Sequence, residues 1–259
     1  MHAGPTGLSA RRRVLLGAAA LAAVPLALRA QPRGGFYAQW VDAGGLPVMA
    51  SARVDPLALQ AAAQVVQGML ARRADLLAVL RAAGVRVAVI GRDELTTDLP
   101  EYADLQPREH WNARTRGVGA TRERPVCSVA EENLLGLTGD RYRGESILVH
   151  EFAHTVFDLA ATRLDAALAP RLRTLYRQAM DAGLWQRTYA AANASEYWAE
   201  GVQSWFDANR HQSAANGVHG PVATRAALKA HDPALADVIA GVFGDTPWRW
   251  DRPGLHAGT

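Results

Sequence analysis

The stretch from Ile147 to Phe157 limits the possible folds of this chain more than any other stretch does, because it combines the pattern of an apolar helix with titratable side chains. Within it, the pattern His150-Glu-x-x-His154 places two histidines one helical turn apart, so both imidazoles point to the same side. That spacing suits a single Zn²⁺, and Glu151 beside them could take a proton from a metal-bound water. We therefore expect an active-site helix that needs a third ligand from elsewhere in the chain.

The third ligand is expected on a predicted helix at residues 193–209. Glu196 and Glu200 are four residues apart and share one face of it, while Trp198 and Trp205 belong to the apolar stripe that packs on the core. We assign Glu196 as the third ligand and Glu200 as the acceptor for the N–H of a ligand imidazole, a partner that metal-bound histidines usually have. The reverse assignment of the two glutamates is the competing hypothesis.

Other residues compete for roles at the same centre. Asp158, four residues beyond His154, is a second candidate partner for a ligand imidazole. His219 is the runner-up third ligand, on the logic of a downstream histidine. The longer pattern H-E-x-x-H-x-x-G-x-x-H is not met, because Ala160 and Arg163 stand at its glycine and histidine positions. Three later histidines lie in a loop-rich segment and are expected at the surface: His211, His231 and, if it is not a ligand, His219.

The order of the predicted elements favours an α+β fold, with a small mixed sheet in the N-terminal half and helices in the C-terminal half. The expected elements are a hairpin at 36–49, a helix at 56–83, strands at 85–90 and 125–129, and helices at 164–182, 193–209, 222–230 and 233–243. The polar stretch 91–124 is either a solvated surface loop or the border of a cleft. We expect residues 31–259 to form one domain.

The N-terminal 30 residues have the features of an export signal. Arg11-Arg-Arg13 precedes an apolar run, from Val14 to Leu28, that is short for a membrane span, and Ala30 offers a cleavage point. Both the twin-arginine and the Sec route fit this segment. We predict an exported protein, periplasmic or extracellular, that has no stable membrane association after the signal is cleaved.

The charge balance argues against a nucleic-acid partner. The formal net charge is +3, but four of the 28 basic residues and no acids lie in the first 30 residues, which leaves 24 basic and 25 acidic residues in the remainder. A near-neutral body has no electrostatic footprint for nucleic acid. The single cysteine, Cys127, cannot form an internal disulfide and is expected to be a small buried side chain on a strand.

The two motifs together resemble the gluzincin branch of the zinc metallopeptidases. The stretch Tyr189-Ala-Ala-Ala-Asn-Ala-Ser-Glu196-Tyr-Trp-Ala-Glu200 is similar to the third-ligand helix of the anthrax lethal factor catalytic domain. The chain also resembles uncharacterised secreted proteins that carry an HEFAH helix and an EYWAEG helix. The likeness covers roughly residues 115–245. It implies a zincin-like fold and a peptide or protein substrate.

The resemblance also implies roles for individual residues. It makes Glu196 the ligand, Glu151 the general base and Tyr189 the phenol that stabilises the oxyanion. The competing interpretation of Tyr189 is a core tyrosine that caps a helix. The strand from Pro125 to Val129 would be the edge strand that pairs with substrate. We therefore predict a secreted or periplasmic zinc-dependent metallopeptidase. The alternatives are a zincin-scaffold binding protein with little turnover and a zinc amidase that acts on cell-wall amides.

Overall fold

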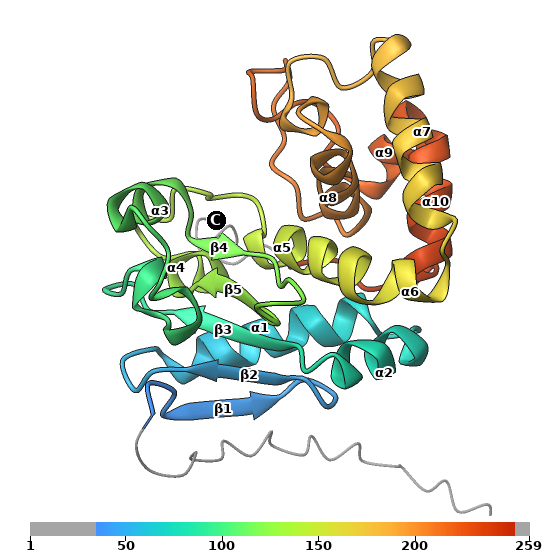
Figure 1. The fold of residues 1–259 in the computed structure, drawn as a ribbon. Helices are drawn as coiled ribbons and strands as arrows, with labels where there is room; N and C mark the ends of the chain where they lie inside the picture. Colours follow the sequence, from blue (N-terminus) through green and yellow to red (C-terminus); the bar gives the residue numbers. More distant parts are fainter. Residues whose placement is uncertain (1–34, 252–259) are drawn as a thin grey trace, which may run out of the picture.

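The computed structural model describes residues 35–251, and a five-stranded sheet occupies their N-terminal half (Figure 1). The strand order is β1-β2-β3-β5-β4, with β2, β3 and β5 parallel and β1 and β4 antiparallel to their neighbours. The strands are β1 (Gln39–Asp42), β2 (Pro47–Ala50), β3 (Arg86–Ile90), β4 (Gly117–Val118) and β5 (Val126–Ala130). The predicted export signal at residues 1–30 lies outside the described residues.

Helices surround the sheet and form the C-terminal half. Those of the N-terminal half are α1 (Pro56–Met69), α2 (Ala74–Ala82), α3 (Arg108–Arg114) and α4 (Glu131–Leu135), with short 3₁₀ turns at Thr96–Asp98 and Pro100–Tyr102. They are followed by α5 (Ile147–Val156), a π-helical turn (Phe157–Ala161), α6 (Thr162–Leu164) and α7 (Leu168–Asp181). The last elements are a 3₁₀ turn (Tyr189–Ala191), α8 (Ala194–Trp205), α9 (Arg225–His231) and α10 (Pro233–Phe243). This arrangement confirms the predicted α+β fold class.

Helix α5 lies between the sheet and the C-terminal helices (Figure 1). It starts at Ser146, whose side chain accepts a hydrogen bond from the Val149 amide, and nearly all of its residues are buried. On its far side it packs against α8, where the fully buried Trp198 donates its indole N–H to the Ala153 carbonyl at 2.9 Å. A helix that is apolar on almost every face is therefore fixed from two sides.

The sheet is buried on both faces. One face, with Val87, Val89, Cys127 and Val129, belongs to the main core that includes α1 and α5. The other face packs against a smaller apolar cluster around Tyr102. Tyr102 itself comes from the second of the two 3₁₀ turns. Cys127 is fully buried on β5, as predicted.

The single helix predicted at 56–83 is wrong, because α1 ends at Met69 and α2 begins at Ala74. The break coincides with a long-range contact. The Arg73 guanidinium donates to the carbonyls of Gly241 and Val242 at the end of α10 and pairs with Asp75. Apolar residues keep their helical spacing across this break, so the sequence pattern does not indicate it. The feature that coincides with the break is the contact of Arg73 with α10.

The predicted edge strand is also wrong. The strand that begins after Pro125 is β5, and it lies between β3 and β4, so the edge strand on that side of the sheet is β4. The stretch 91–124 is not a plain solvated loop, since it contains α3 and β4 and borders the cleft described below. Helix boundaries differ by a few residues: α7 starts at Leu168, α8 ends at Trp205 and α9 starts at Arg225. Within residues 35–251, no helix is long and apolar enough to span a membrane.

Candidate metal centre and cleft

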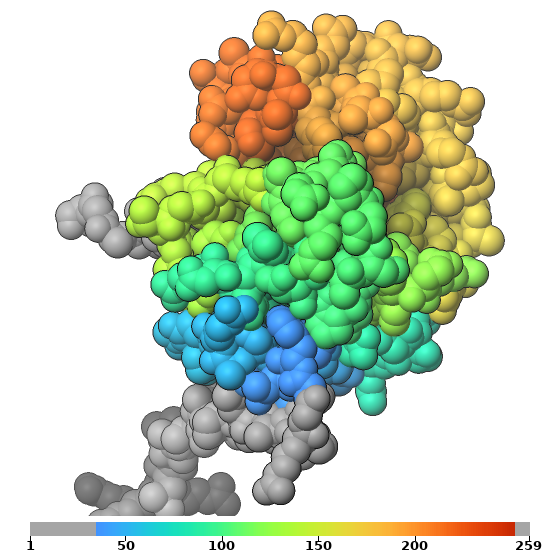
Figure 2. Space-filling view, turned by 60° about the vertical axis from the view of Figure 1, so that its left-hand side comes forward, coloured from blue at the N-terminus to red at the C-terminus, as the bar shows by residue number. Residues whose placement is uncertain are grey.

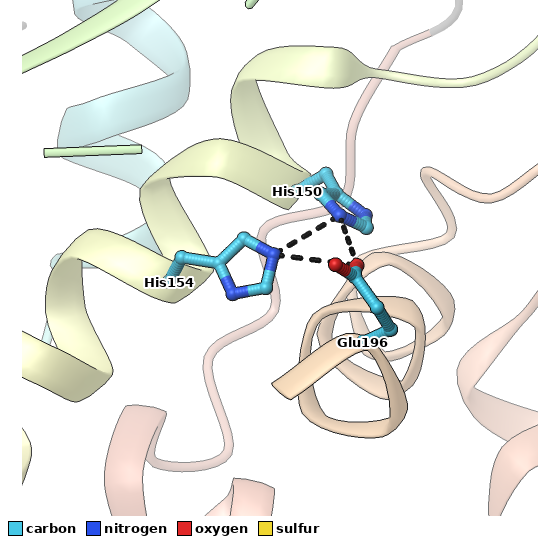
Figure 3. A group of neighbouring side chains, drawn as sticks. All are labelled: His150, His154 and Glu196. Carbon is cyan, nitrogen blue, oxygen red and sulfur yellow. Dashed lines mark hydrogen bonds and ion pairs between the residues drawn. The ribbon is translucent and has the colours of Figure 1, made fainter. Parts of the chain in front are cut away.

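Helices α5 and α8 bring His150, His154 and Glu196 together (Figure 3). The two Nε2 atoms are 3.1 Å apart, and Glu196 Oε2 lies 3.0 Å from Nε2 of His150 and 3.5 Å from Nε2 of His154. Ligands at ordinary zinc bond lengths in a tetrahedron are separated by about 3.3 to 3.5 Å. We call these three residues the ligand triad. Its spacing is close to that of three ligands around one zinc ion.

The position of Glu196 follows from the start of α8. Asn193 precedes the helix, and its side-chain oxygen accepts hydrogen bonds from the amides of Ser195 at 2.9 Å and Glu196 at 3.0 Å. This N-cap places Glu196 in the first turn, facing α5. The sequence spacing predicted a shared helix face, and the cap sets where that face begins.

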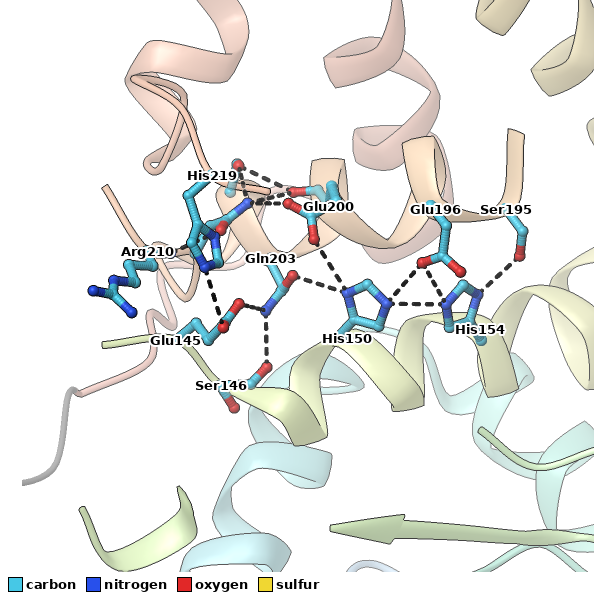
Figure 4. Close-up of polar contacts among 12 residues, drawn as sticks. Glu145, Ser146, His150, His154, Ser195, Glu196, Glu200, Gln203, Arg210 and His219 are labelled. Atoms are coloured by element: carbon cyan, nitrogen blue, oxygen red, sulfur yellow. Dashed lines mark hydrogen bonds and ion pairs between the residues drawn. The ribbon is translucent and has the colours of Figure 1, made fainter. Parts of the chain in front are cut away.

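Gln203 fixes the tautomer of His150 (Figure 4). Its amide nitrogen donates to the Ser146 carbonyl at 3.1 Å and lies 3.5 Å from a carboxylate oxygen of Glu145. Its amide oxygen therefore faces Nδ1 of His150, at 2.9 Å, and has to accept a proton from it. With its proton on Nδ1, a neutral His150 directs a lone pair from Nε2 into the triad.

His154 has a partner of another kind. Its Nδ1 lies 3.0 Å from Oγ of Ser195, an exposed residue in the first turn of α8 (Figure 4). Asp158, the partner suggested by spacing, lies on the surface in the π-helical turn and lines the cleft, but makes no hydrogen bond or ion pair with His154. The side chain next to Nδ1 of His154 is therefore that of Ser195.

Glu200 lies on the Nδ1 side of His150, away from the triad. Its Oε1 is 3.6 Å from that nitrogen, farther than Gln203, and its Oε2 accepts a hydrogen bond from Asn209 at 2.9 Å. Burial raises the pKa of this carboxyl. The geometry thus puts Glu196 where a ligand would be and Glu200 among the outer partners of His150.

The charges around the triad call for a cation. Burial alone would lower the pKa of His150, but the hydrogen bond to Glu196 and the charges of Glu151 and Glu200 outweigh it and raise the pKa to about 10. Burial alone would raise the pKa of Glu196, but its hydrogen bonds and charge interactions with His150 and His154 outweigh burial and lower the pKa. Without a metal, a proton on His150 balances the negative charge of Glu196. A metal ion that binds the triad would have to displace that proton. The donor set, two imidazoles and a carboxylate, fits zinc.

Glu151 is next to the triad but belongs to a different environment. It lines the cleft, and its carboxylate forms neither a hydrogen bond nor an ion pair with any described residue. Its side chain lies below β4, where a Cβ at Gly117 would come within 3.3 Å of its Cγ. The carboxylate is therefore free to exchange a proton with a molecule in the cleft.

Tyr189 also lines the cleft and is 38% exposed, so it is not a core tyrosine. Its ring stacks on His150, with centroids 6.3 Å apart, and its backbone N–H donates to the Val218 carbonyl at 2.8 Å. Partial burial and the negative charge of Glu196 raise the pKa of Tyr189 to about 12. The phenol accordingly keeps its proton at neutral pH and can donate it in a hydrogen bond.

His219 is buried, against the surface position expected for it. Its Nε2 faces Glu145, at 3.6 Å, and not the triad. Glu145 is itself buried, and this raises its pKa to about 7. Among the other late histidines, His231 is partly buried against Trp185, at 5.0 Å between ring centroids, and His211 is exposed.

Two glycines let β4 approach α5 closely. A Cβ at Gly117 would lie 2.6 Å from Ile147 and 3.0 Å from the Ser128 carbonyl, and one at Gly119 would lie 3.1 Å from Cβ of His154. Any larger residue would push the strand away from the helix. The edge of the sheet is thereby held directly above Glu151.

The cleft over the triad has a volume of about 710 Å³, which is in the range of ligand pockets. Its floor is formed by the triad and Glu151. We call residues 111, 114–115, 117–121, 141–142 and 218 the cleft rim. Figure 2 shows part of this region, where the green segment that includes α3 lies between the blue N-terminal part below and the orange and gold C-terminal part above.

Sequence reasoning missed several residues of this site. Gln203 could have been found, because it lies seven residues beyond Glu196 and therefore on the same face of α8. Ser195 precedes the ligand directly but carries no metal-site signal of its own. Gly117, Gly119 and the rim arginines Arg114 and Arg141 reach the cleft only through tertiary packing.

No family model and no curated protein matches this chain. Among solved structures, it is similar to the Pro-Pro endopeptidase PPEP-2 from Paenibacillus alvei, with a TM-score of 0.48 and 20% sequence identity. The alignment covers 71% of this chain and 91% of that chain. A likeness at this level bears neither on the metal nor on the reaction.

Proposed function

We propose that this protein is an exported zinc-dependent peptidase with a zincin-like fold and His150, His154 and Glu196 as its metal ligands. The observation that carries the proposal is the ligand triad. Its three donor atoms lie 3.0 to 3.5 Å apart, and the amide of Gln203 directs the His150 lone pair toward the other two. Export is proposed from the predicted signal at residues 1–30.

Zinc bound there would act as a Lewis acid, which makes water acidic enough to be a nucleophile near neutral pH. The chain's own residues supply the remaining chemistry. The free carboxylate of Glu151 accepts the proton of the attacking water and passes it to the leaving amine. The protonated Tyr189 donates a hydrogen bond to the oxyanion that develops on the carbonyl.

The peptide backbone has a binding surface beside these groups. β4 is one of the two edge strands of the sheet, and it lines the cleft above Glu151. An extended peptide added to such an edge is held by main-chain hydrogen bonds. A peptide or protein is therefore the proposed substrate, with its scissile carbonyl over the triad.

The proposal is tested by metal analysis of the purified protein together with cleavage of a peptide library. We expect about one zinc per chain and loss of cleavage after chelation. Glu151→Gln, which keeps size and hydrogen bonding, should retain zinc and lose about 10²- to 10⁴-fold in kcat.

Three outcomes would redirect the proposal. Absence of zinc from the wild-type protein would overturn it. Cleavage confined to a peptidoglycan digest would favour a cell-wall amidase, and zinc without any turnover would favour a binding protein. The matched control is Glu132→Gln, since Glu132 is paired with Arg116 and does not line the cleft.

A further inference from the structure

The cleft carries two positive charges on its rim that have no carboxylate partner. Arg114 at the end of α3 and Arg141 in the loop before α5 both line it and are both exposed. Neither forms an ion pair with a described residue. Seven other arginines of the N-terminal half do pair with carboxylates: Arg53, Arg73, Arg86, Arg92, Arg108, Arg116 and Arg124.

Two hydrogen bonds join the segments that carry the two arginines. Nη1 of Arg141 donates to the Ala113 carbonyl at 2.7 Å, and the Tyr142 hydroxyl lies 3.4 Å from the Arg114 carbonyl. These bonds fasten the loop around residue 141 to the end of α3.

Aromatic rings lie beside both guanidinium groups. The Arg114 guanidinium is 6.0 Å from the centre of the Trp111 ring, and that of Arg141 is 5.3 Å from the centre of the Tyr142 ring. A guanidinium near an aromatic face loses less freedom when it binds a further group, and its planar fork matches a carboxylate.

Arg114 also lies near one of the proposed reacting groups. The positive charge of Arg114 acts on the Tyr189 phenol and lowers its pKa, against the larger effects of burial and Glu196 that raise it. The uncompensated charge of the two arginines would attract an anionic group of a substrate to the rim of the cleft.

We propose that Arg114 and Arg141 bind a carboxylate of the substrate, so that the enzyme prefers peptides with an acidic group close to the scissile bond. This inference rests on the proposed peptidase function. The carboxylate could be an Asp or Glu side chain or the free C-terminus of the peptide. Both present the same planar, bidentate acceptor to the two guanidinium groups.

The test uses matched peptides with Asp, Asn or Lys at one position at a time, each with a free or amidated C-terminus. We expect the wild-type kcat/KM to favour the Asp or free-acid peptide about tenfold to a hundredfold over its neutral isostere. In the Arg114→Gln/Arg141→Gln variant, which keeps a donor near the Ala113 carbonyl, this ratio should fall to near one. In Arg114→Glu/Arg141→Glu, the Lys peptide should be preferred.

The control is Arg143→Glu, because Arg143 is an exposed neighbour that does not line the cleft. Its ratio should equal that of the wild type. Affinity of the same peptides for the Glu151→Gln variant, measured by fluorescence anisotropy, gives a readout without turnover. Equal affinity for acidic and neutral peptides, or a preference that survives in the Gln/Gln variant, overturns the carboxylate site. Absence of zinc and of all cleavage overturns the peptidase instead.

Discussion

The floor and the rim of the cleft hold their side chains in different ways. On the floor, His150 is fixed by Gln203, Glu196 by a helix N-cap, and both lie between two packed helices. On the rim, Arg114 and Arg141 are exposed. The guanidinium of Arg141 donates to one backbone carbonyl, and each guanidinium lies near an aromatic ring. The side chains of the floor are held in place for metal binding, whereas side chains of the rim can be substituted without moving the metal ligands. Substitutions should therefore cost most where the partners are buried.

The largest effect is expected at the ligand itself. Glu196→Ala removes one of three donors and should lower zinc affinity by more than a hundredfold, beyond the tenfold to hundredfold that loss of an outer partner costs. Glu200→Ala should fall within the latter range, since Glu200 lies on the Nδ1 side of His150. Zinc titration with a competing chelator measures both. Zinc lost from the Glu200 variant alone would reverse the assignment.

The support of the floor can be tested without metal. Trp198→Ala removes a fully buried indole and its hydrogen bond to Ala153, which joins α8 to α5. We expect a loss of about 3 to 5 kcal/mol in the free energy of unfolding, measured by denaturant titration. Trp248→Ala is the matched control, because Trp248 is only partly buried against Phe206 and Gly68. Equal losses would contradict a central role for the α5–α8 contact.

Gln203 tests whether tautomer control matters. Gln203→Leu keeps the volume but leaves Nδ1 of His150 without its acceptor, and we expect about a tenfold to hundredfold loss of zinc affinity. Ser204→Ala on the same helix is the control, since Ser204 bonds the carbonyls of Glu200 and Val222 and no ligand. Unchanged zinc affinity in the Leu variant would show that the triad needs no fixed tautomer.

The contrast between floor and rim also explains how much the sequence predicted. The floor was predictable because its main residues are related by spacing within one helix, His150 to His154 and Glu196 to Glu200. Gln203 obeys the same spacing, but a neutral amide carries no metal-site signal, so it was missed. The fold class was readable from the order of strands and helices.

The rim depends on contacts between distant segments, which periodicity does not encode. β4 has only two residues, and a strand of that length gives no alternating pattern, so the edge was assigned to the longer β5. The break after Met69 is marked by the contacts of Arg73 with the end of α10. Likewise, the segments that carry Arg114 and Arg141 meet because the loop before α5 is bonded to α3.

The smallest loss of zinc affinity is expected at Ser195, because this partner of the ligand His154 is exposed to solvent. Ser195→Ala removes the hydroxyl beside Nδ1 of His154, but the site is exposed and water can take the vacated hydrogen bond. Zinc affinity should fall by less than about tenfold, below the range for a buried outer partner. Chelator competition in parallel with Gln203→Leu makes the comparison direct. A Ser195 loss as large as that of Gln203 would mean that burial does not set the strength of these outer partners, and that both ligand histidines depend equally on the residue behind them.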